Sequence, residues 1–396
     1  MPYKSNINNY KKPYPLGIIG GGQLALMLVE AAKKRDIKVC VQTKSLSDPG
    51  SLKADLVIEA DPLQVRGNKS LIKECEKIIF ENEWIRIDKL KELSSNNFFV
   101  PDLEALSPLV DRISQKKFIN KLNLPTPRWI SLTDFKKLSE DLREKWEFPL
   151  MAKSFKGGYD GKGNKKISNK KEFEIFISKN SSEEWLLEEW IDYKNEFALV
   201  GSRDKSGKIR LFPIVETFQS NNVCHWVLSP ANTNYEINQF ALNIFSSIVN
   251  ELNYIGVLGI EFFFGKEGLL INEIAPRTHN SGHFSIEACN TSQFDQYICI
   301  SCGVNPPEIE MNSQGSLMVN LLGLKSDFHL SIDERIKRLS DIEGANLHWY
   351  GKLKENFGRK MGHITFLLHE KTFDERLSKS KILIKRISKI WPSPHD

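Results

Sequence analysis

The segment VLGIEFFFGKEGLLINEIA, residues 257–275, constrains the fold more than any other part of the chain. Two apolar runs flank a short turn, which predicts a β-hairpin. Each run carries one carboxylate, Glu261 or Glu273, in otherwise apolar surroundings. A buried carboxylate needs a cation or strong hydrogen-bond donors, and two close together favour a shared metal ion. The hairpin therefore predicts a Mg²⁺ site, because paired carboxylates commonly hold Mg²⁺ on nucleotide phosphates.

The loop of this hairpin decides whether the two carboxylates share a face of the sheet. If Glu261 pairs directly with Glu273, both side chains lie on one face. Direct pairing requires an odd loop, for example Lys266-Glu267-Gly268 with Gly268 in the left-handed conformation, or an equivalent β-bulge. A two-residue loop alone would pair Glu261 with Asn272 and turn Glu273 to the opposite face. We predict the odd loop or the bulge.

Two glycine-rich segments are candidate phosphate sites. MAKSFKGGYDGKGN (151–164) combines glycines with lysines but lacks the GxxxxGK[ST] pattern of the commoner ATP loop. The triplet Gly20-Gly21-Gly22 lies between a strand-like run and a helical run, a frame in which a helix N-terminus binds phosphate. The next predicted strand ends in Thr43-Lys44, where an NAD site usually has an acidic residue, so NAD is disfavoured.

The bulk properties indicate an ordinary globular protein. A length of 396 residues favours two or three domains. The formal net charge of +5 is too small to argue for nucleic acid as a partner. The chain has no apolar run of the roughly 18 residues that span a membrane, and its polar start does not resemble a signal peptide. We therefore expect no membrane partner and a cytoplasmic location.

Cys299 and Cys302 form a C-x-x-C pair. A zinc site needs a second pair or histidines at ligand spacing, and His279 and His283 keep that alternative open. We interpret the pair as two thiols in one turn of a largely buried helix. Farther upstream, KIRLFPIVET (208–217) is interpreted as one strand.

Several motifs together resemble the ATP-grasp superfamily: Lys153, the loop GGYDGKG, the EEWI turn, Glu196, Glu261 and INEIAPR. Within that superfamily, INEIAPRTHNSGH, HWYGK and GRKMGH are similar to motifs of the N5-carboxyaminoimidazole ribonucleotide synthase family. The resemblance extends over most of the chain. It implies an α/β and α+β fold of three domains: a Rossmann-like pre-ATP-grasp domain (1–105), an ATP-grasp domain (106–315) and a small β-rich C-terminal domain (316–396).

The resemblance also implies a reaction. ATP, bicarbonate and 5-aminoimidazole ribonucleotide would give N5-carboxyaminoimidazole ribonucleotide, ADP and phosphate through carboxyphosphate, in de novo purine biosynthesis. The implied metal is Mg²⁺, with Mn²⁺ as an alternative, and the implied assembly is a homodimer. Another ATP-grasp carboxylate–amine ligase and a non-catalytic nucleotide-binding protein are the alternatives. HNSGH and HWYGK disfavour the first, and intact Lys153, Glu261 and Glu273 disfavour the second.

The resemblance assigns residues to ATP and to the metal. The glycine loop would be a flap over the phosphates, joining two strands. The ATP-binding residues would be Arg112, Lys153, Gly158, Gly161, Gly163, Glu188, Glu189, Trp190, Ile191, Glu196, Asn272 and Glu273. Among them, Glu196 would hold the ribose hydroxyls, and residues 188–191 would run along the adenine. Glu261 and Glu273 would hold the metal.

The second substrate would lie between the domains. The residues around carboxyphosphate and the reacting amine would be Tyr159, Asp160, Lys162, Arg277 and His279. The ribonucleotide would be bound by Gly22, Gln23, Leu24, Glu81, Lys352 and Arg359. Glu83 is the alternative to Glu81 for the ribose hydroxyls. One position departs from the family pattern, because Gln219 stands where a histidine is usual.

Overall fold

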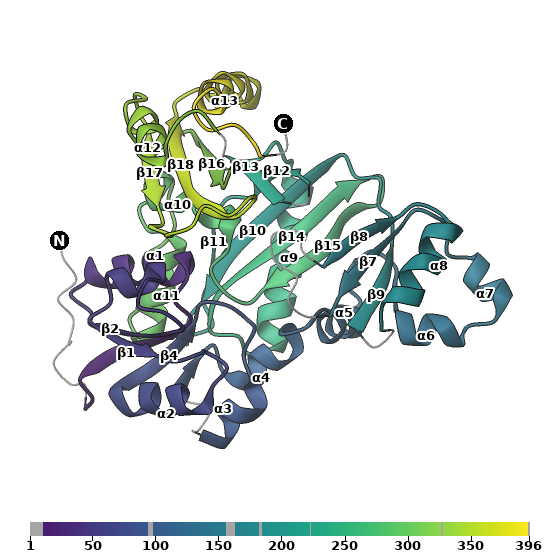
Figure 1. Ribbon diagram of the computed structural model, residues 1–396, viewed down its shortest axis with the longest axis horizontal. Coiled ribbons are helices and arrows are strands. Elements are labelled where there is room, and N and C mark those ends of the chain that lie inside the picture. Colours follow the sequence, from purple (N-terminus) through teal and green to yellow (C-terminus); the bar gives the residue numbers. More distant parts are fainter. Residues whose placement is uncertain are drawn as a thin grey trace.

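The computed structural model describes residues 11–93, 98–155, 163–181, 184–221, 223–325 and 328–394. These residues form three β-sheets with surrounding helices. In Figure 1 the N-terminal sheet lies at the lower left, a long central sheet crosses the middle, a small sheet lies at the right, and the last strands lie at the top. The predicted mixture of α/β and α+β domains is confirmed. No helix in the described ranges is long and apolar enough to cross a membrane.

The first sheet is parallel and has the strand order β3-β2-β1-β4-β5. Its predicted strand–turn–helix start is confirmed, because an apolar strand ends at the glycine triplet and a helix begins at Gln23. The elements of this part are β1 (Tyr14–Ile19), α1 (Gln23–Lys33), β2 (Val39–Thr43), β3 (Leu56–Glu59), α2 (Val65–Glu74), β4 (Cys75–Phe80), α3 (Ile87–Leu93), β5 (Phe99–Val100) and α4 (Leu103–Leu106). Neighbouring β1 and β4 are parallel, so the glycine triplet and Glu81 meet at their carboxyl ends.

The small sheet is antiparallel, with the order β6-β9-β7-β8. Its glycine-rich segment joins two paired strands, as predicted, although residues 156–162 lie outside the described residues. The elements are α5 (Arg112–Lys121), β6 (Trp129–Ser131), α6 (Leu132–Lys137), α7 (Glu140–Glu144), β7 (Leu150–Ser154), β8 (Asn164–Ile167), α8 (Lys170–Lys179) and β9 (Trp185–Glu189). Aromatic residues of the helices, including Phe135, Phe173 and Phe176, fill the core under this sheet.

The long sheet continues without a break from the hairpin of β14 and β15 to the last strands of the chain. Its order is β15-β14-β10-β12-β13-β16-β18-β17, with β11 paired to β10. Its strands are β10 (Asn195–Arg203), β11 (Ile209–Leu211), β12 (Val215–Ser220), β13 (Val223–Ser229), β14 (Gly256–Gly265), β15 (Gly268–Ala275), β16 (Gly315–Leu322), β17 (Asn346–Trp349) and β18 (Lys360–Leu368). The single strand predicted at 208–217 is wrong, because Pro213 lies between β11 and β12 and cannot donate a ladder hydrogen bond.

Helices accompany this sheet along its length. They are α9 (Tyr235–Glu251), α10 (Ser285–Ala288), α11 (Gln293–Ser301), α12 (Ile332–Ser340) and α13 (Phe373–Ser388). Neither α12 nor α13 was predicted, so the last segment contains more helix than its β-rich description implied. Cys299 is buried in α11 and Cys302 caps it, which confirms the interpretation as a largely buried helix.

The hairpin pairs Glu261 with Glu273, as predicted, and a β-bulge makes this pairing possible. Gly265 pairs with Gly268, so the loop has two residues and the three-residue example is wrong. The register then shifts by one residue between Glu261 and Phe262, which leaves Asn272 as the extra residue of β15. Gly268 has φ +80°, the left-handed conformation expected of it.

Candidate active site

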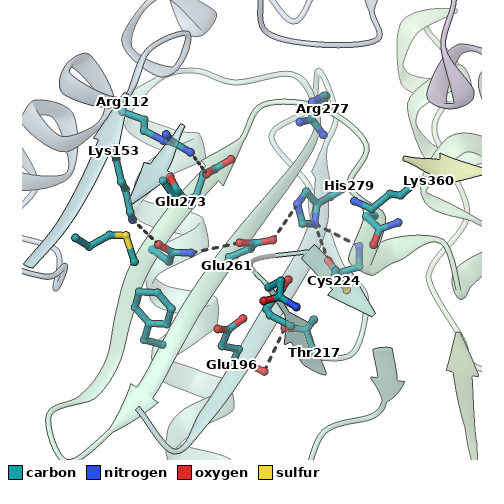
Figure 2. A pocket seen from close by; sticks show the side chains of 18 of the residues that line it. Arg112, Lys153, Glu196, Thr217, Cys224, Glu261, Glu273, Arg277, His279 and Lys360 are labelled. Atoms are coloured by element: carbon teal, nitrogen blue, oxygen red, sulfur yellow. Dashed lines mark hydrogen bonds and ion pairs between the residues drawn. The ribbon is translucent and has the colours of Figure 1, made fainter. Parts of the chain in front are cut away.

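One cavity of about 800 Å³ lies where the three sheets meet. Most of the predicted site residues that the structure describes line it, although they come from distant parts of the sequence (Figure 2). They are Gln23, Leu24, Glu81, Arg112, Lys153, Glu188, Glu189, Trp190, Ile191, Glu196, Glu261, Asn272, Glu273, Arg277, His279, Lys352 and Arg359. We call the part around Arg112, Lys153 and Glu188 the Lys153 end, and the part around Glu81, Lys352 and Arg359 the Lys352 end.

At the Lys153 end, the lysine is held by two acceptors. Lys153 Nζ lies 2.6 Å from Glu188 Oε2 and donates to Asn272 Oδ1 at 2.9 Å. Its side chain is only 8 % exposed, so it is not a solvated surface lysine. Nearby, Arg112 lies 3.5 Å from Glu273 and donates to the carbonyl of Ser154 at 3.0 Å. Two cations are thus fixed beside the first strand of the glycine-rich loop.

Glu188 is the centre of a buried charge cluster. Besides Lys153 it contacts Lys116 Nζ at 2.8 Å, and Lys116 also donates to Thr126 Oγ1 at 2.6 Å. Burial opposes ionisation of Glu188, but the two lysines outweigh it and lower the pKa of Glu188 to about 2. Burial also disfavours the charged form of Lys116 and lowers its pKa to about 8 despite Glu188. Glu188 therefore remains ionised and holds Lys153 in place.

The β-bulge at Asn272 brings two neighbouring side chains of β15 to the same cavity wall. Regular alternation along a strand would send Asn272 and Glu273 to opposite faces, yet both line the cavity. Asn272 Nδ2 donates to Glu261 Oε2 at 3.3 Å, so a chain of contacts runs from Lys153 through Asn272 and Glu261 to His279 (Figure 2). Burial raises the pKa of Glu261, but His279 and nearby cations outweigh it and lower the pKa overall.

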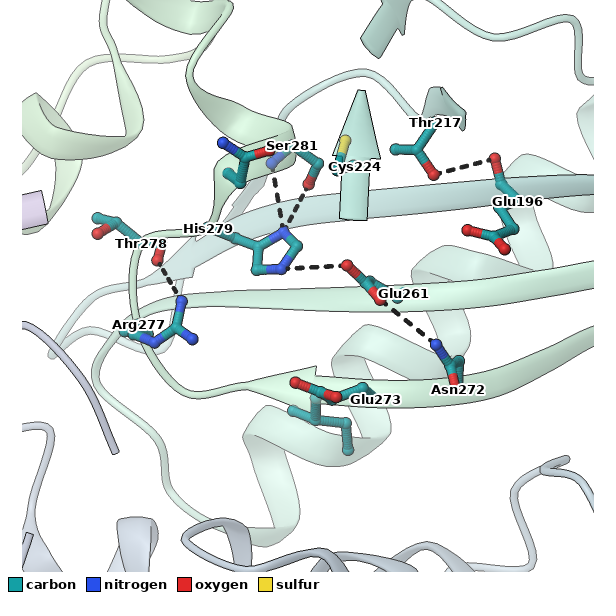
Figure 3. Close-up of polar contacts among 12 residues, drawn as sticks. Glu196, Thr217, Cys224, Glu261, Asn272, Glu273, Arg277, Thr278, His279 and Ser281 are labelled. Atoms are coloured by element: carbon teal, nitrogen blue, oxygen red, sulfur yellow. Dashed lines mark hydrogen bonds and ion pairs between the residues drawn. The ribbon is translucent and has the colours of Figure 1, made fainter. Parts of the chain in front are cut away.

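His279 belongs to the segment that follows the hairpin, and its ring contacts Glu261 on β14 (Figure 3). Its Nδ1 lies 2.8 Å from Ser281 Oγ and accepts from the Ser281 N–H at 3.4 Å. Its Nε2 lies 3.3 Å from Glu261 Oε1 and donates to that carboxylate, so Nε2 carries a proton. The ring occupies space left by Gly259, where a Cβ would come within 2.7 Å of His279 Cβ. Gly259 on β14 thus makes room for the histidine.

Beside the Lys352 end, two carboxylates two residues apart have different partners, and of the two only Glu81 is among the described residues that line the cavity. Glu81 accepts from the Gly22 N–H at 2.7 Å and the Ala25 N–H at 3.5 Å, at the N-terminus of α1. Burial raises its pKa, and these hydrogen bonds only partly oppose the effect. Glu83 instead forms an ion pair with Arg277, with its Oε2 2.6 Å from Nε. Burial opposes ionisation of Glu83, but Arg277 outweighs it and lowers the pKa.

Lys352 and Arg359 both line the cavity from the connection between β17 and β18. Lys352 is 9 % exposed, and its Nζ donates to the carbonyl of Lys360 at 2.5 Å. Although burial keeps the pKa of Glu81 raised overall, this buried cation lowers that pKa electrostatically. Lys352 is therefore not an exposed charge on the surface.

Glu196 lines the cavity between the two ends. Burial, together with the nearby Glu261, raises its pKa to about 7, although hydrogen bonds from Tyr193 and Gln219 oppose the shift. Gln219 therefore contacts Glu196 as a neutral donor, where a histidine would be able to carry charge.

The other predicted site residues do not form a common cluster, and their contacts differ from one residue to the next. Glu189 forms an ion pair with Arg128 at 2.8 Å, and Lys166 lies 4.1 Å above the ring of Trp190. Gly163 has φ +79°, which favours glycine at the end of the loop. Gly158, Tyr159, Asp160, Gly161 and Lys162 lie outside the described residues.

Sequence reasoning missed several residues of the site. Lys116 is one of two adjacent lysines on an amphipathic helix, and nothing in the pattern distinguishes it from exposed Lys117. Lys360 lies within the recognised GRKMGH motif and lines the cavity, so that motif could have indicated it. His283 also lines the cavity, and the HNSGH motif contained the signal.

Comparisons with known proteins cover nearly the whole chain. Three domain families match it: the ribonucleotide synthetase preATP-grasp domain at residues 14–109, the ATP-grasp domain at 117–294, and the phosphoribosylaminoimidazole carboxylase C-terminal domain at 316–374. The N5-carboxyaminoimidazole ribonucleotide synthase of Synechococcus elongatus is 36 % identical over 380 residues, 96 % of each chain.

Solved structures agree with these matches. The N5-carboxyaminoimidazole synthetase from Staphylococcus aureus complexed with ADP has a TM-score of 0.84 and 30 % identity, over 96 % of this chain and 99 % of that one. The synthase from Aspergillus clavatus in complex with ADP and 5-aminoimidazole ribonucleotide has a TM-score of 0.83 and 27 % identity, over 95 % and 99 %. The domains, the relatives and the cavity agree, and the chain belongs to the N5-carboxyaminoimidazole ribonucleotide synthase family of ATP-grasp ligases.

Proposed function

We propose that this cavity carries out the ATP-dependent carboxylation of 5-aminoimidazole ribonucleotide, with bicarbonate as the carbon source and carboxyphosphate as the intermediate. The observation that carries the proposal is that the Lys153 end and the Lys352 end belong to one cavity. The Lys153 end suits a nucleoside triphosphate, and the Lys352 end suits a phosphorylated amine. The relatives solved with ADP, and with ADP and 5-aminoimidazole ribonucleotide, support the same pair of ligands.

ATP is proposed to bind at the Lys153 end. Lys153 and Arg112 donate to its phosphates, and residues 188–191 lie along the adenine. Glu196 accepts hydrogen bonds from the ribose hydroxyls. Because Glu188 and Asn272 already fix the Lys153 ammonium, little reorganisation is needed when the phosphates arrive.

Mg²⁺ is the proposed metal, with Mn²⁺ as an alternative. Glu261, Glu273 and the amide of Asn272 place oxygen atoms on one wall, which is the donor chemistry that Mg²⁺ prefers. Among the described residues, no group of three or more His, Cys, Asp or Glu side chains is placed to hold a metal. Two carboxylates that share the ion with phosphates and water fit this arrangement. The ion would offset negative charge on the transferring phosphoryl group.

The ribonucleotide is proposed to bind at the Lys352 end. Lys352 and Arg359 donate to its 5′-phosphate, and the backbone of Gly22, Gln23 and Leu24 lies nearby. Glu81 accepts from the ribose hydroxyls, because its long contact of 3.5 Å to the Ala25 N–H leaves acceptor capacity.

The chemistry then proceeds in two steps. A bicarbonate oxygen attacks the γ-phosphorus of ATP, and the bond to the ADP oxygen breaks. The substrate amine next bonds to the carboxyl carbon of carboxyphosphate, the bond from that carbon to the phosphate oxygen breaks, and the proton lost by the amine passes to the departing phosphate. Arg277 stabilises the negative charge, and His279 lies beside the reacting groups with its Nε2 on Glu261. We keep the prediction that three residues of the loop, Tyr159, Asp160 and Lys162, surround carboxyphosphate and the reacting amine.

The test is ADP release with Mg²⁺-ATP and bicarbonate, in the presence and absence of 5-aminoimidazole ribonucleotide. The proposal expects ribonucleotide-stimulated ADP release with product formed in equal amount. ADP release that the ribonucleotide does not stimulate would contradict it. The domain boundaries near residues 105 and 315 and the homodimer are proposed on family resemblance, and light scattering of the purified chain tests the dimer.

A further inference from the structure

Gln293 is a fully buried side chain that contacts both histidines of the segment after the hairpin. It is 0 % exposed and is the first residue of α11. Its Oε1 accepts from the backbone N–H of His279 at 2.8 Å, and its Nε2 donates to the carbonyl of the same residue at 2.7 Å. One carboxamide thus satisfies both backbone groups of His279.

This double contact fixes the orientation of the carboxamide. If the amide were turned over, its NH₂ group would face the backbone N–H and its oxygen would face the carbonyl oxygen. The second hydrogen on Nε2 then points to His283 Nδ1, which lies 3.0 Å away. His283 Nδ1 must therefore accept, and the proton of its neutral ring lies on Nε2.

The helix that carries Gln293 is itself firmly held. A capping box of Ser292 and Asp295 begins α11. The Tyr297 hydroxyl donates to the carbonyl of Val100 at 2.7 Å, which ties the helix to the first domain. The Gln293 N–H also donates to Ser285 Oγ at 3.0 Å, and Ser285 Oγ donates to the carbonyl of Gly282 at 2.5 Å. Gln293 acts from a rigid support on a segment that lines the cavity.

We propose that Gln293 is a positioning residue, which fixes the backbone of His279 and holds His283 as an Nε2–H donor at the cavity wall. His279 then keeps its contact with Glu261 (Figure 3), and His283 offers a neutral N–H to the oxygen-rich groups of the substrates. The expected effect of Gln293 on turnover rests on the proposed function. The positions of the two histidines that Gln293 fixes do not depend on it.

The first test is the tautomer of His283 in the full-length, ligand-free protein, from ¹⁵N NMR of histidine-labelled chain. His283→Gln assigns the signal. We expect the proton on Nε2 in the unsubstituted protein. A proton on Nδ1 would overturn the proposal. This measurement needs no turnover, so failure of ribonucleotide-stimulated ADP release would contradict the proposed function and leave the tautomer result standing.

The second test compares two buried glutamines of the same helix. Gln296 is also 0 % exposed, but it contacts Ser202 Oγ at 2.9 Å and the carbonyl of Pro307 at 2.8 Å instead of the histidines. We expect Gln293→Met to lower kcat by about 10- to 100-fold, because small misplacements of catalytic groups have effects of that size, with KM for ATP little changed.

Gln296→Met serves as the matched control and is expected to change kcat by less than about threefold. Equal losses of kcat in the two variants would overturn the proposal, because they would indicate a general packing role. Gln293→Glu is the near-isosteric second variant. Its extra oxygen would face the carbonyl of His279 and attract a proton to His283 Nδ1, so we expect the His283 tautomer signal to change. An unchanged signal would contradict the proposed contact.

Discussion

The Lys153 end and the Lys352 end of the cavity hold their charges by different means. At the Lys153 end, the partners are side chains: Lys116 and Lys153 share Glu188, and Asn272 completes the cluster. At the Lys352 end, backbone groups do much of this work, because Gly22 donates to Glu81 and Lys352 donates to the carbonyl of Lys360. One ion pair, Glu83 with Arg277, connects the first sheet to the segment after the hairpin.

This difference predicts how each end of the cavity should respond to substitution. A side-chain cluster with buried charges fails when one member is removed, because the partner keeps its charge without compensation. Charges held by backbone groups keep their anchors when a neighbour is substituted. We therefore expect substitutions at the Lys153 end to affect stability and turnover, and those at the Lys352 end to affect binding of one substrate.

The largest effect is expected from Glu273→Ala. Loss of one proposed metal ligand should lower Mg²⁺-dependent turnover by at least about 100-fold, the size seen when one group that stabilises transition-state charge is removed. Steady-state ADP release measures this change. Glu267→Ala, in the exposed loop of the same hairpin, is the control and should be near normal. Normal turnover in Glu273→Ala would refute the metal assignment.

Lys116→Met should lower the free energy of unfolding by about 3 kcal/mol, because it leaves Glu188 with one cation where it had two. The pKa of Glu188 is lowered to about 2, so its contribution to stability is present above pH 4.5 and is lost as pH falls toward 2. In the variant the native pKa of Glu188 lies closer to 4.5, so this acid loss should be smaller and should end at a higher pH. Urea unfolding across this pH range measures both effects, with exposed Lys117→Met as the control. Equal stability of the two variants would contradict the cluster.

Lys352→Ala should raise KM for the ribonucleotide by about 10- to 100-fold, which corresponds to the loss of a charge-assisted hydrogen bond. KM for ATP should change by less than about threefold. Initial rates with each substrate varied in turn separate the two constants. Lys354→Ala removes an exposed lysine two residues away and should change neither. An equal rise in both KM values would contradict the assignment of Lys352 to the ribonucleotide phosphate.

Glu83→Gln and Glu81→Gln compare a carboxylate held by the Arg277 side chain with its neighbour at the Lys352 end, which backbone N–H groups hold. Glu83→Gln leaves Arg277 without its charged partner and should lower kcat by about tenfold. Glu81→Gln should instead raise KM for the ribonucleotide with a smaller change in kcat. The opposite pattern would assign the ribose hydroxyls to Glu83, the alternative considered from the sequence.

The smallest effect is expected at Glu196, between the two ends. Its pKa is raised to about 7, above the ordinary 4.5, so the native protein holds a proton that the unfolded chain releases. The free energy of unfolding should therefore fall as pH rises from about 5 to 7, on the order of 1 kcal/mol. Glu196→Gln should remove this decline in metal-free buffer. An identical pH dependence in both proteins would show that Glu196 does not carry the raised pKa.

Much of the fold was predictable from the sequence. The strand, glycine triplet and helix at the N-terminus follow from local periodicity, whereas the connection of β7 and β8 by the glycine-rich loop was expected from the family resemblance. The hairpin was predictable in more detail, because only a bulge or an odd loop lets Glu261 face Glu273. Periodicity did not separate β11 from β12 around Pro213. Helices α12 and α13 did carry a helical signal that the prediction overlooked, because in α13 the buried residues Arg376, Ser380, Leu383 and Ile387 recur at helical spacing.

The sequence by itself determined the family, the chemical types in the site and the pairing of the two hairpin carboxylates. These properties are local, since they depend on motifs and on the period of a strand. The tertiary structure alone decided that Lys116 is buried while Lys117 is exposed, that Glu83 pairs with Arg277, and that Gln293 contacts both histidines. Each of these contacts joins residues whose neighbours in sequence carry no sign of the partner, because packing of distant segments brings them together.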